Sequence, residues 1–158
     1  RSADYVKTVS ECYREAVNSV LDGTYSKEKI DGWTGRLRGV FNRGFWDGYY
    51  LGREMGEWSG RYGSQATRRK ILVGKISNYF SKLGVAEISV EANELLRGDE
   101  VMITGPTTGV IEFTPEEVRL DDKAVDLVPK ANKCSVKTPE LVRRGDKVFR
   151  IVETTDSF

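Results

Sequence analysis

Histidine is absent from this 158-residue chain, and cysteine occurs only twice. Without histidine, the chain contains no Ser-His-Asp or Cys-His relay and no histidine-ligated metal site of its own. Cys12 and Cys134 lie far apart and follow no metal-ligand spacing. We therefore expect two buried free thiols, because free cysteine is most often a small core residue. The sequence alone leaves a disulfide open.

Long apolar runs are also missing. No stretch approaches the ~20 apolar residues that a membrane-spanning helix needs, and no signal peptide is visible. We expect a cytoplasmic protein. The length and the 39% hydrophobic content suit one ordinary domain, or one small domain with an arm. Because the sequence begins with Arg1 rather than Met, it leaves open whether the chain is a truncation or a stand-alone protein.

Positive charge and tryptophan are concentrated in one part of the chain, which we call the basic aromatic segment (residues 36–75). It carries nine Lys or Arg against three acidic residues, whereas the rest of the chain is net acidic. All three tryptophans lie between residues 33 and 58, and residues 42–52 contain four aromatics and three glycines. Such a stretch is typical of either a tight packing joint or a surface that binds something flat.

Two helices are predicted at the start of the chain. Apolar residues at spacings of three and four predict a helix over residues 3–21, with Ser2 as a cap and Asp22-Gly23 as the end. A second helix is predicted from a Ser26 cap to about residue 41. The apolar face of the first helix is wide, so we expect something larger than the second helix to cover it.

The character of the chain changes at Arg69. Short β-branched segments alternate with Gly and Pro turn signals at 71–76, 85–91, 101–104, 110–113, 124–128, 133–136 and 147–153. Many short strands without helices between them predict a small antiparallel β-barrel. We therefore predict an α+β fold with two parts: a helical arm and aromatic, glycine-rich joint (1–68), and a barrel domain (69–158).

The tripeptide Arg-Gly-Asp occurs twice, at residues 97–99 and 144–146, each time before a predicted strand. A cell-adhesion motif is one interpretation. The favoured one is a pair of Gly-Asp turns that lead the chain into related strands.

Several segments resemble the collagenase-like peptidase family U-32. Residues 1–6 (Arg-Ser-Ala-Asp-Tyr-Val) and 13–17 resemble the segment that follows the catalytic barrel of that family. Residues 42–52 resemble its motif Asn-Arg-Gly-Phe-x-x-Gly-Phe-Tyr-x-Gly. Residues 73–76 and 95–106 resemble its C-terminal β-barrel, which is similar to domain 2 of elongation factor Tu. The resemblance covers nearly the whole chain and implies a barrel of the translation-factor type.

The resemblance also implies a catalytic α/β barrel upstream, whose clustered cysteines hold an iron–sulfur cluster in several members. No catalytic, cofactor-binding or metal-binding residue of the family maps onto this chain, and Cys12 and Cys134 do not match the cluster motif. We expect no catalytic set and no cofactor in this chain. Some members are named as peptidases and others resemble RNA hydroxylases, so the reaction of the parent protein stays open.

The leading hypothesis is a non-catalytic C-terminal accessory module that positions RNA, such as tRNA or rRNA, for the upstream barrel. Lys and Arg neutralise phosphates, and exposed aromatics stack unpaired bases. The candidate substrate- or RNA-binding residues are Arg43, Phe45, Trp46, Tyr49, Tyr50, Arg53, Arg61, Arg68, Arg69 and Lys70.

Three alternatives stand beside it. The aromatics Phe45, Trp46 and Tyr49 would simply fill the seam between helices and barrel, with a solvated basic rim. In the second alternative, the chain is the substrate-binding domain of a collagenase-like protease and binds an extended polypeptide by sheet-edge pairing. In the third, it is a purely structural docking domain for the upstream catalytic domain. The sequence predicts no membrane partner and no particular oligomeric state.

Overall fold

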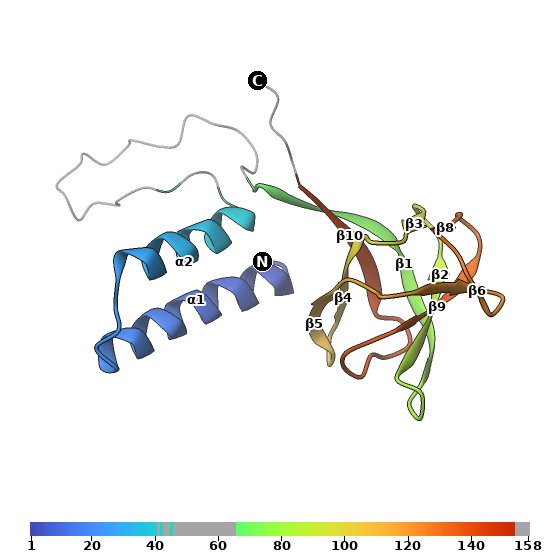
Figure 1. Cartoon of the computed structure of the whole chain (residues 1–158), viewed down its shortest axis with the longest axis horizontal. Helices are drawn as coiled ribbons and strands as arrows, with labels where there is room; N and C mark the ends of the chain where they lie inside the picture. The colour runs from blue at the N-terminus through green and yellow to red at the C-terminus, as the bar shows by residue number, and fades with distance from the viewer. Residues whose placement is uncertain (41, 43–44, 46–65, 154–158) are drawn as a thin grey trace, which may run out of the picture. The chain divides into compact units, whose positions relative to one another are not determined.

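The computed structural model describes residues 1–40, 42, 45 and 66–153. The chain divides into two compact units, one built on Arg1–Arg68 and one on Arg69–Glu153. Helices make up the first unit and strands the second (Figure 1). The predicted α+β class is confirmed, since two helices precede a mostly antiparallel sheet.

Helices α1 (Ala3–Leu21) and α2 (Lys27–Gly39) pack side by side as a hairpin (Figure 1). The end of α1 is a Schellman motif: the Thr24 amide donates to the Ser19 carbonyl and the Gly23 amide to the Val20 carbonyl. Gly23 adopts a φ of 67°, which glycine reaches without steric cost. The predicted stop at Asp22-Gly23 is therefore confirmed.

The two predicted caps differ. The Ser26 hydroxyl accepts a hydrogen bond from the Lys29 amide at 3.4 Å, as predicted for the start of α2. Ser2 occupies the N-cap position of α1 with extended backbone, but its side chain makes no capping hydrogen bond. The position of the first cap was therefore right and its side-chain bond was not.

Ten strands lie in residues 68–153. Most coincide with predicted segments, two short strands overlap the predicted segment 124–128, and two others were not predicted. Their bounds are β1 (Arg68–Phe80), β2 (Val85–Val90), β3 (Leu95–Leu96), β4 (Glu100–Gly105), β5 (Gly109–Phe113), β6 (Val118–Leu120), β7 (Lys123–Ala124), β8 (Leu127–Val128), β9 (Lys133–Lys137) and β10 (Lys147–Glu153).

Eight of these strands form one sheet in the order β5-β4-β10-β1-β2-β9-β6-β7, and β3 pairs with β8 separately. The C-terminal strand β10 thus lies between β4 and β1, in the interior of the sheet. No pairing in the described residues joins the end strands β5 and β7. The predicted barrel is therefore not closed by a hydrogen-bonded seam in this part of the chain.

The core of the second unit follows the period of two that strands impose. In β2, Ala86, Ile88 and Val90 are fully buried, whereas the residues between them are half-buried, as the alternation predicted. Buried valines and isoleucines from β1, β4, β9 and β10 join them in one apolar cluster, to which β3, β5, β6 and β8 also contribute. Truncating such a side chain to Ala typically costs ~2–5 kcal/mol.

The two Arg-Gly-Asp sequences form matching turns. In each, the Asp carboxylate accepts a hydrogen bond from the amide three residues earlier: Leu96 donates to Asp99 at 2.9 Å and Arg143 to Asp146 at 2.8 Å. The central glycine has a positive φ in both turns. Each turn leads directly into a strand, β4 or β10, and these two strands pair with each other. The Gly-Asp turn interpretation is confirmed.

Candidate functional site

Six of the ten predicted binding residues lie outside the described residues: Arg43, Trp46, Tyr49, Tyr50, Arg53 and Arg61. The other four can be placed. Phe45 belongs to the first unit and is 53% exposed, so its ring is available to a ligand. Arg68, Arg69 and Lys70 begin strand β1.

These three basic residues do not share one face. Side chains alternate along a strand, so Arg69 points to the opposite side from Arg68 and Lys70. Arg68 is half-buried, whereas Arg69 and Lys70 are exposed. The Lys70 ammonium lies 5.4 Å from the centre of the Phe149 ring on β10, a cation–π distance. The described part of the basic aromatic segment therefore offers basic groups on two sides of β1.

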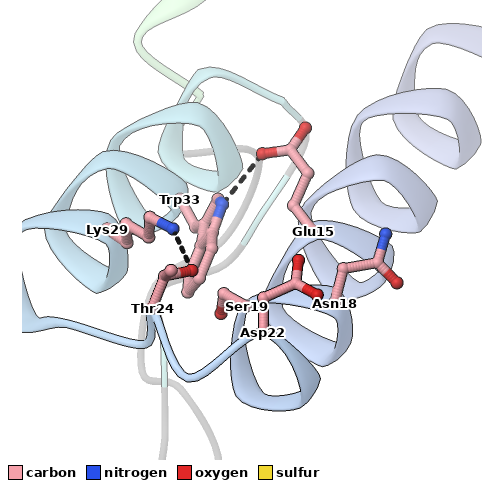
Figure 2. A pocket seen from close by; sticks show the side chains of 7 residues that line it. All are labelled: Glu15, Asn18, Ser19, Asp22, Thr24, Lys29 and Trp33. Atoms are coloured by element: carbon pink, nitrogen blue, oxygen red, sulfur yellow. Dashed lines mark hydrogen bonds between the residues drawn. The ribbon is translucent and has the colours of Figure 1, made fainter.

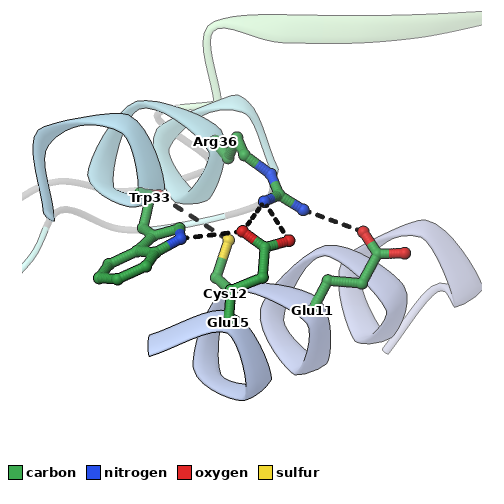
Figure 3. A network of polar contacts seen from close by, with 5 residues as sticks. All are labelled: Glu11, Cys12, Glu15, Trp33 and Arg36. Carbon is green, nitrogen blue, oxygen red and sulfur yellow. Dashed lines mark hydrogen bonds and ion pairs between the residues drawn. The ribbon is translucent and has the colours of Figure 1, made fainter. Parts of the chain in front are cut away.

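The best-defined polar site is one that the sequence did not predict, and it joins the two helices (Figure 3). The Glu15 carboxylate on α1 accepts hydrogen bonds from the Trp33 indole at 2.9 Å and from the Arg36 guanidinium at 2.8 Å. Arg36 also pairs with Glu11 at 3.0 Å. Arg36 was counted with the basic aromatic segment, but its guanidinium forms ion pairs with Glu11 and Glu15 inside the helical hairpin.

This network changes the acidity of its members. Hydrogen bonds from Arg36 and then Trp33 hold the pKa of Glu15 below its ordinary value. The same bond to Glu15 raises the pKa of Arg36. Cys12 lies beneath the network, and burial raises the pKa of its thiol. Two spacings in the sequence are compatible with this network: Glu11 and Glu15 are four residues apart on α1, and Trp33 and Arg36 are three residues apart on α2. Neither spacing alone shows that the two pairs face each other, because that depends on how the helices pack.

A pocket of about 290 Å³ adjoins the network at the connection between the helices (Figure 2). Glu15 and Trp33 form one side, and the rest of the lining comes from Asn18, Ser19, Asp22, Thr24 and Lys29. The Lys29 ammonium donates to the Thr24 hydroxyl at 2.6 Å. Ligand pockets are usually larger and mostly apolar, so this one suits at most a small polar group.

Cys12 and Cys134 are both buried and free, which confirms the predicted state of the thiols. Burial raises the pKa of Cys134 to about 12, so this sulfur is a thiol at neutral pH. Among residues 1–40, 42, 45 and 66–153, no group of three Cys, Asp or Glu side chains is arranged to hold a metal ion. In the same residues, neither helix is long and apolar enough to cross a membrane.

Comparison with known proteins relates this chain to one protein family. The model of peptidase family U32 matches residues 1–60, which contain α1, α2 and part of the basic aromatic segment. The resemblance to this family predicted from the motifs is confirmed by this match and by the relatives described next.

Two curated relatives make the likeness more specific. The chain is 53% identical, over 95% of its length, to a protein named "Collagenase" from Porphyromonas gingivalis. It is 35% identical, over 98% of its length, to a protein named "Uncharacterized protease" from Methanocaldococcus jannaschii. It spans only 36% and 38% of those two relatives, so it corresponds to well under half of each.

Among solved structures, the chain resembles the C-terminal domain of a Geobacillus thermoleovorans protein named "putative U32 peptidase". The TM-score is 0.47 at 19% identity, and the match covers 49% of this chain and 96% of that domain.

Proposed function

We propose that this chain is a non-catalytic accessory module of a U32 protein and positions substrate for a catalytic domain outside the chain. The observation that carries the proposal is the state of its nucleophiles. Both thiols are buried and protonated at neutral pH, and the sequence holds no histidine to activate a hydroxyl or bind a metal. The described residues of each unit offer binding groups instead: exposed Phe45 in the first unit, and exposed Arg69 with the cation–π pair of Lys70 and Phe149 in the second.

RNA is the substrate class that these groups suit best. Its phosphates are neutralised by Lys and Arg, and unpaired bases stack on exposed rings at ~1–3 kcal/mol each. The basic aromatic segment supplies both kinds of group within one stretch of an otherwise net acidic chain. An acidic remainder also disfavours unspecific binding elsewhere on the chain.

A polypeptide substrate is the second candidate, because a relative 53% identical to this chain is named "Collagenase". An extended polypeptide could pair with an end strand of the sheet, such as β5, and place side chains against aromatic rings. This mode needs little positive charge, so it leaves the charge asymmetry of the chain without a role.

Binding of single-stranded RNA to the purified chain at several salt concentrations tests the proposal. Four or five engaged basic groups predict that log affinity falls with log salt with a slope of about −3. Arg69→Ala should reduce that slope by about one phosphate contact, and Lys123→Ala, which removes an exposed charge outside the segment, should not. Phe45→Ala should weaken binding at every salt concentration and leave the slope unchanged, since stacking is not electrostatic.

Trp46→Ala separates binding from packing. If Trp46 stacks on a base, the variant keeps its stability and loses affinity. If Trp46 fills a core, the variant loses ~3–5 kcal/mol of stability. A destabilised Trp46→Ala variant from a parent that binds no RNA at low salt would exclude the RNA role. Collagen or casein hydrolysis by the purified chain, abolished by a point change within it, would exclude the non-catalytic role.

A further inference from the structure

Helix α1 carries a second apolar face that α2 does not cover. Val6, Tyr13, Val17 and Val20, which we call the α1 stripe, follow one another at spacings of seven, four and three residues and therefore share a face. Each is between 52% and 67% exposed. The positions that α1 buries in the hairpin are different ones, Cys12 and Ser19.

The size of the α1 stripe limits what can cover it. Its exposed apolar area is on the order of 400 Å², within the ~300–600 Å² of the largest patch on a typical monomer, which is often functional. A stable interface between free partners needs ~800 Å² on each side, so this stripe is too small to hold a second copy of the chain by itself. It is large enough for a contact within one polypeptide, where the covalent connection supplies a high effective concentration.

The lengths of the two relatives indicate that a longer polypeptide of this kind exists. They match 95% and 98% of this chain, yet the chain spans only 36% and 38% of their lengths. The stripe also lies inside the residues that the U32 model matches. We infer that the α1 stripe is the surface on which a further part of the U32 polypeptide, outside this chain, docks. The inference rests on the accessory role proposed above and names the face through which the module is held.

The test compares two single carboxylates on neighbouring positions of α1. Val17→Asp places a charge on the stripe, and Asn18→Asp places the same charge one residue on, beside the pocket. Both variants are made in the 158-residue chain and in the polypeptide at its full encoded length. Amide hydrogen exchange of residues 3–21 and the melting temperature are measured in all four proteins.

In the 158-residue chain, the two variants should melt within about 2 °C of each other, because both side chains face solvent. In the full-length polypeptide, Val17→Asp should speed exchange in residues 3–21 at least ~10-fold relative to Asn18→Asp, because it places a charge in an apolar contact. If Val17→Asp prevents full-length expression, the milder Tyr13→Ser should show the same exchange difference.

Three results would overturn the inference. Equal exchange for both variants in the full-length polypeptide would leave the stripe without a partner. A 158-residue chain that dimerises, and whose dimer is lost in Val17→Asp, would assign the stripe to self-association. If the encoded polypeptide proved no longer than 158 residues, no further part of it would exist to dock on the stripe. The RNA salt slope is measured on other residues, so failure of substrate binding and failure of docking are distinguishable.

Discussion

The carboxylate of Asp146 fills the space that a side chain on Gly105 would need. Asp146 lies in the turn before β10 and is 4% exposed, and Gly105 is the last residue of β4, the strand paired with β10. The same carboxylate accepts hydrogen bonds from the Thr108 hydroxyl and the Arg143 amide. One buried acid thus joins its own turn to the turn between β4 and β5.

Gly105→Ala should therefore destabilise the second unit by ~2–4 kcal/mol, because a Cβ atom displaces a buried, hydrogen-bonded carboxylate. Urea unfolding followed by circular dichroism measures the change. The control is Gly32→Ala in α2, where no described atom lies within 4 Å of the new Cβ. That substitution should stabilise the chain by ~0.5–1 kcal/mol. Equal effects of the two substitutions would contradict the close fit at Gly105.

Asp146→Ala and Asp99→Ala remove the same amide hydrogen bond from two matching turns. Asp146 additionally accepts from the Thr108 hydroxyl and is more deeply buried than Asp99, whose carboxylate lies 3.9 Å from the Arg150 guanidinium. Its loss should cost ~2–3 kcal/mol, and the loss at Asp99 about half as much, since leaving buried donors unsatisfied is the larger penalty. The free energies of unfolding of both variants decide the order, and a larger cost at Asp99 would refute it.

Acid should weaken the contact between α1 and α2 before it affects the core. The pKa of Glu15 is lowered on folding, so its contribution to stability is present above its ordinary pKa of 4.5 and is lost as the pH falls below that value. The indole proton resonance of Trp33, which donates to Glu15, should follow this titration with a midpoint below 4.5. Arg36→Ala should move the midpoint upward, and Glu15→Gln should abolish it. A midpoint above 4.5 in the parent would contradict the network.

Neither cysteine should react with iodoacetamide in the native chain at pH 8. Burial excludes the reagent and raises both thiol pKa values, that of Cys134 to about 12, so the reactive thiolate is scarce. Mass spectrometry should find no adduct before unfolding and two after it. Rapid native labelling of Cys134 would show that its strand, β9, opens readily.

The sequence predicted what depends on local patterns. The period of two in Ala86, Ile88 and Val90 located β2 and its buried face, and the Asp22-Gly23 stop located the end of α1. The Gly-Asp turns were recognised because glycine at a positive φ and a carboxylate at the next position act within four residues.

What the sequence could not predict depends on partners far apart in the chain. Arg36 looked like part of a basic surface, because nothing in its neighbourhood shows that Glu11 and Glu15 face it from α1. The predicted strand began at residue 71, so nothing assigned Arg68, Arg69 and Lys70 to alternating sides of a strand. In the structure β1 begins at Arg68, and this places Arg69 on the opposite side from its two neighbours. The short strands β3 and β6 lack a run long enough to reveal a period.

The place of β10 in the sheet has a consequence during synthesis. The strand made last lies between β4 and β1, so a nascent chain that ends before residue 147 leaves an opening in the middle of the sheet. A ribosome-bound chain can complete α1 and α2 early, because their contacts are local. The pairing of β4 and β1 with β10 can form only after β10 has left the exit tunnel. Stalling or C-terminal clipping before that point would expose two unpaired strand edges, on β4 and β1, to other chains.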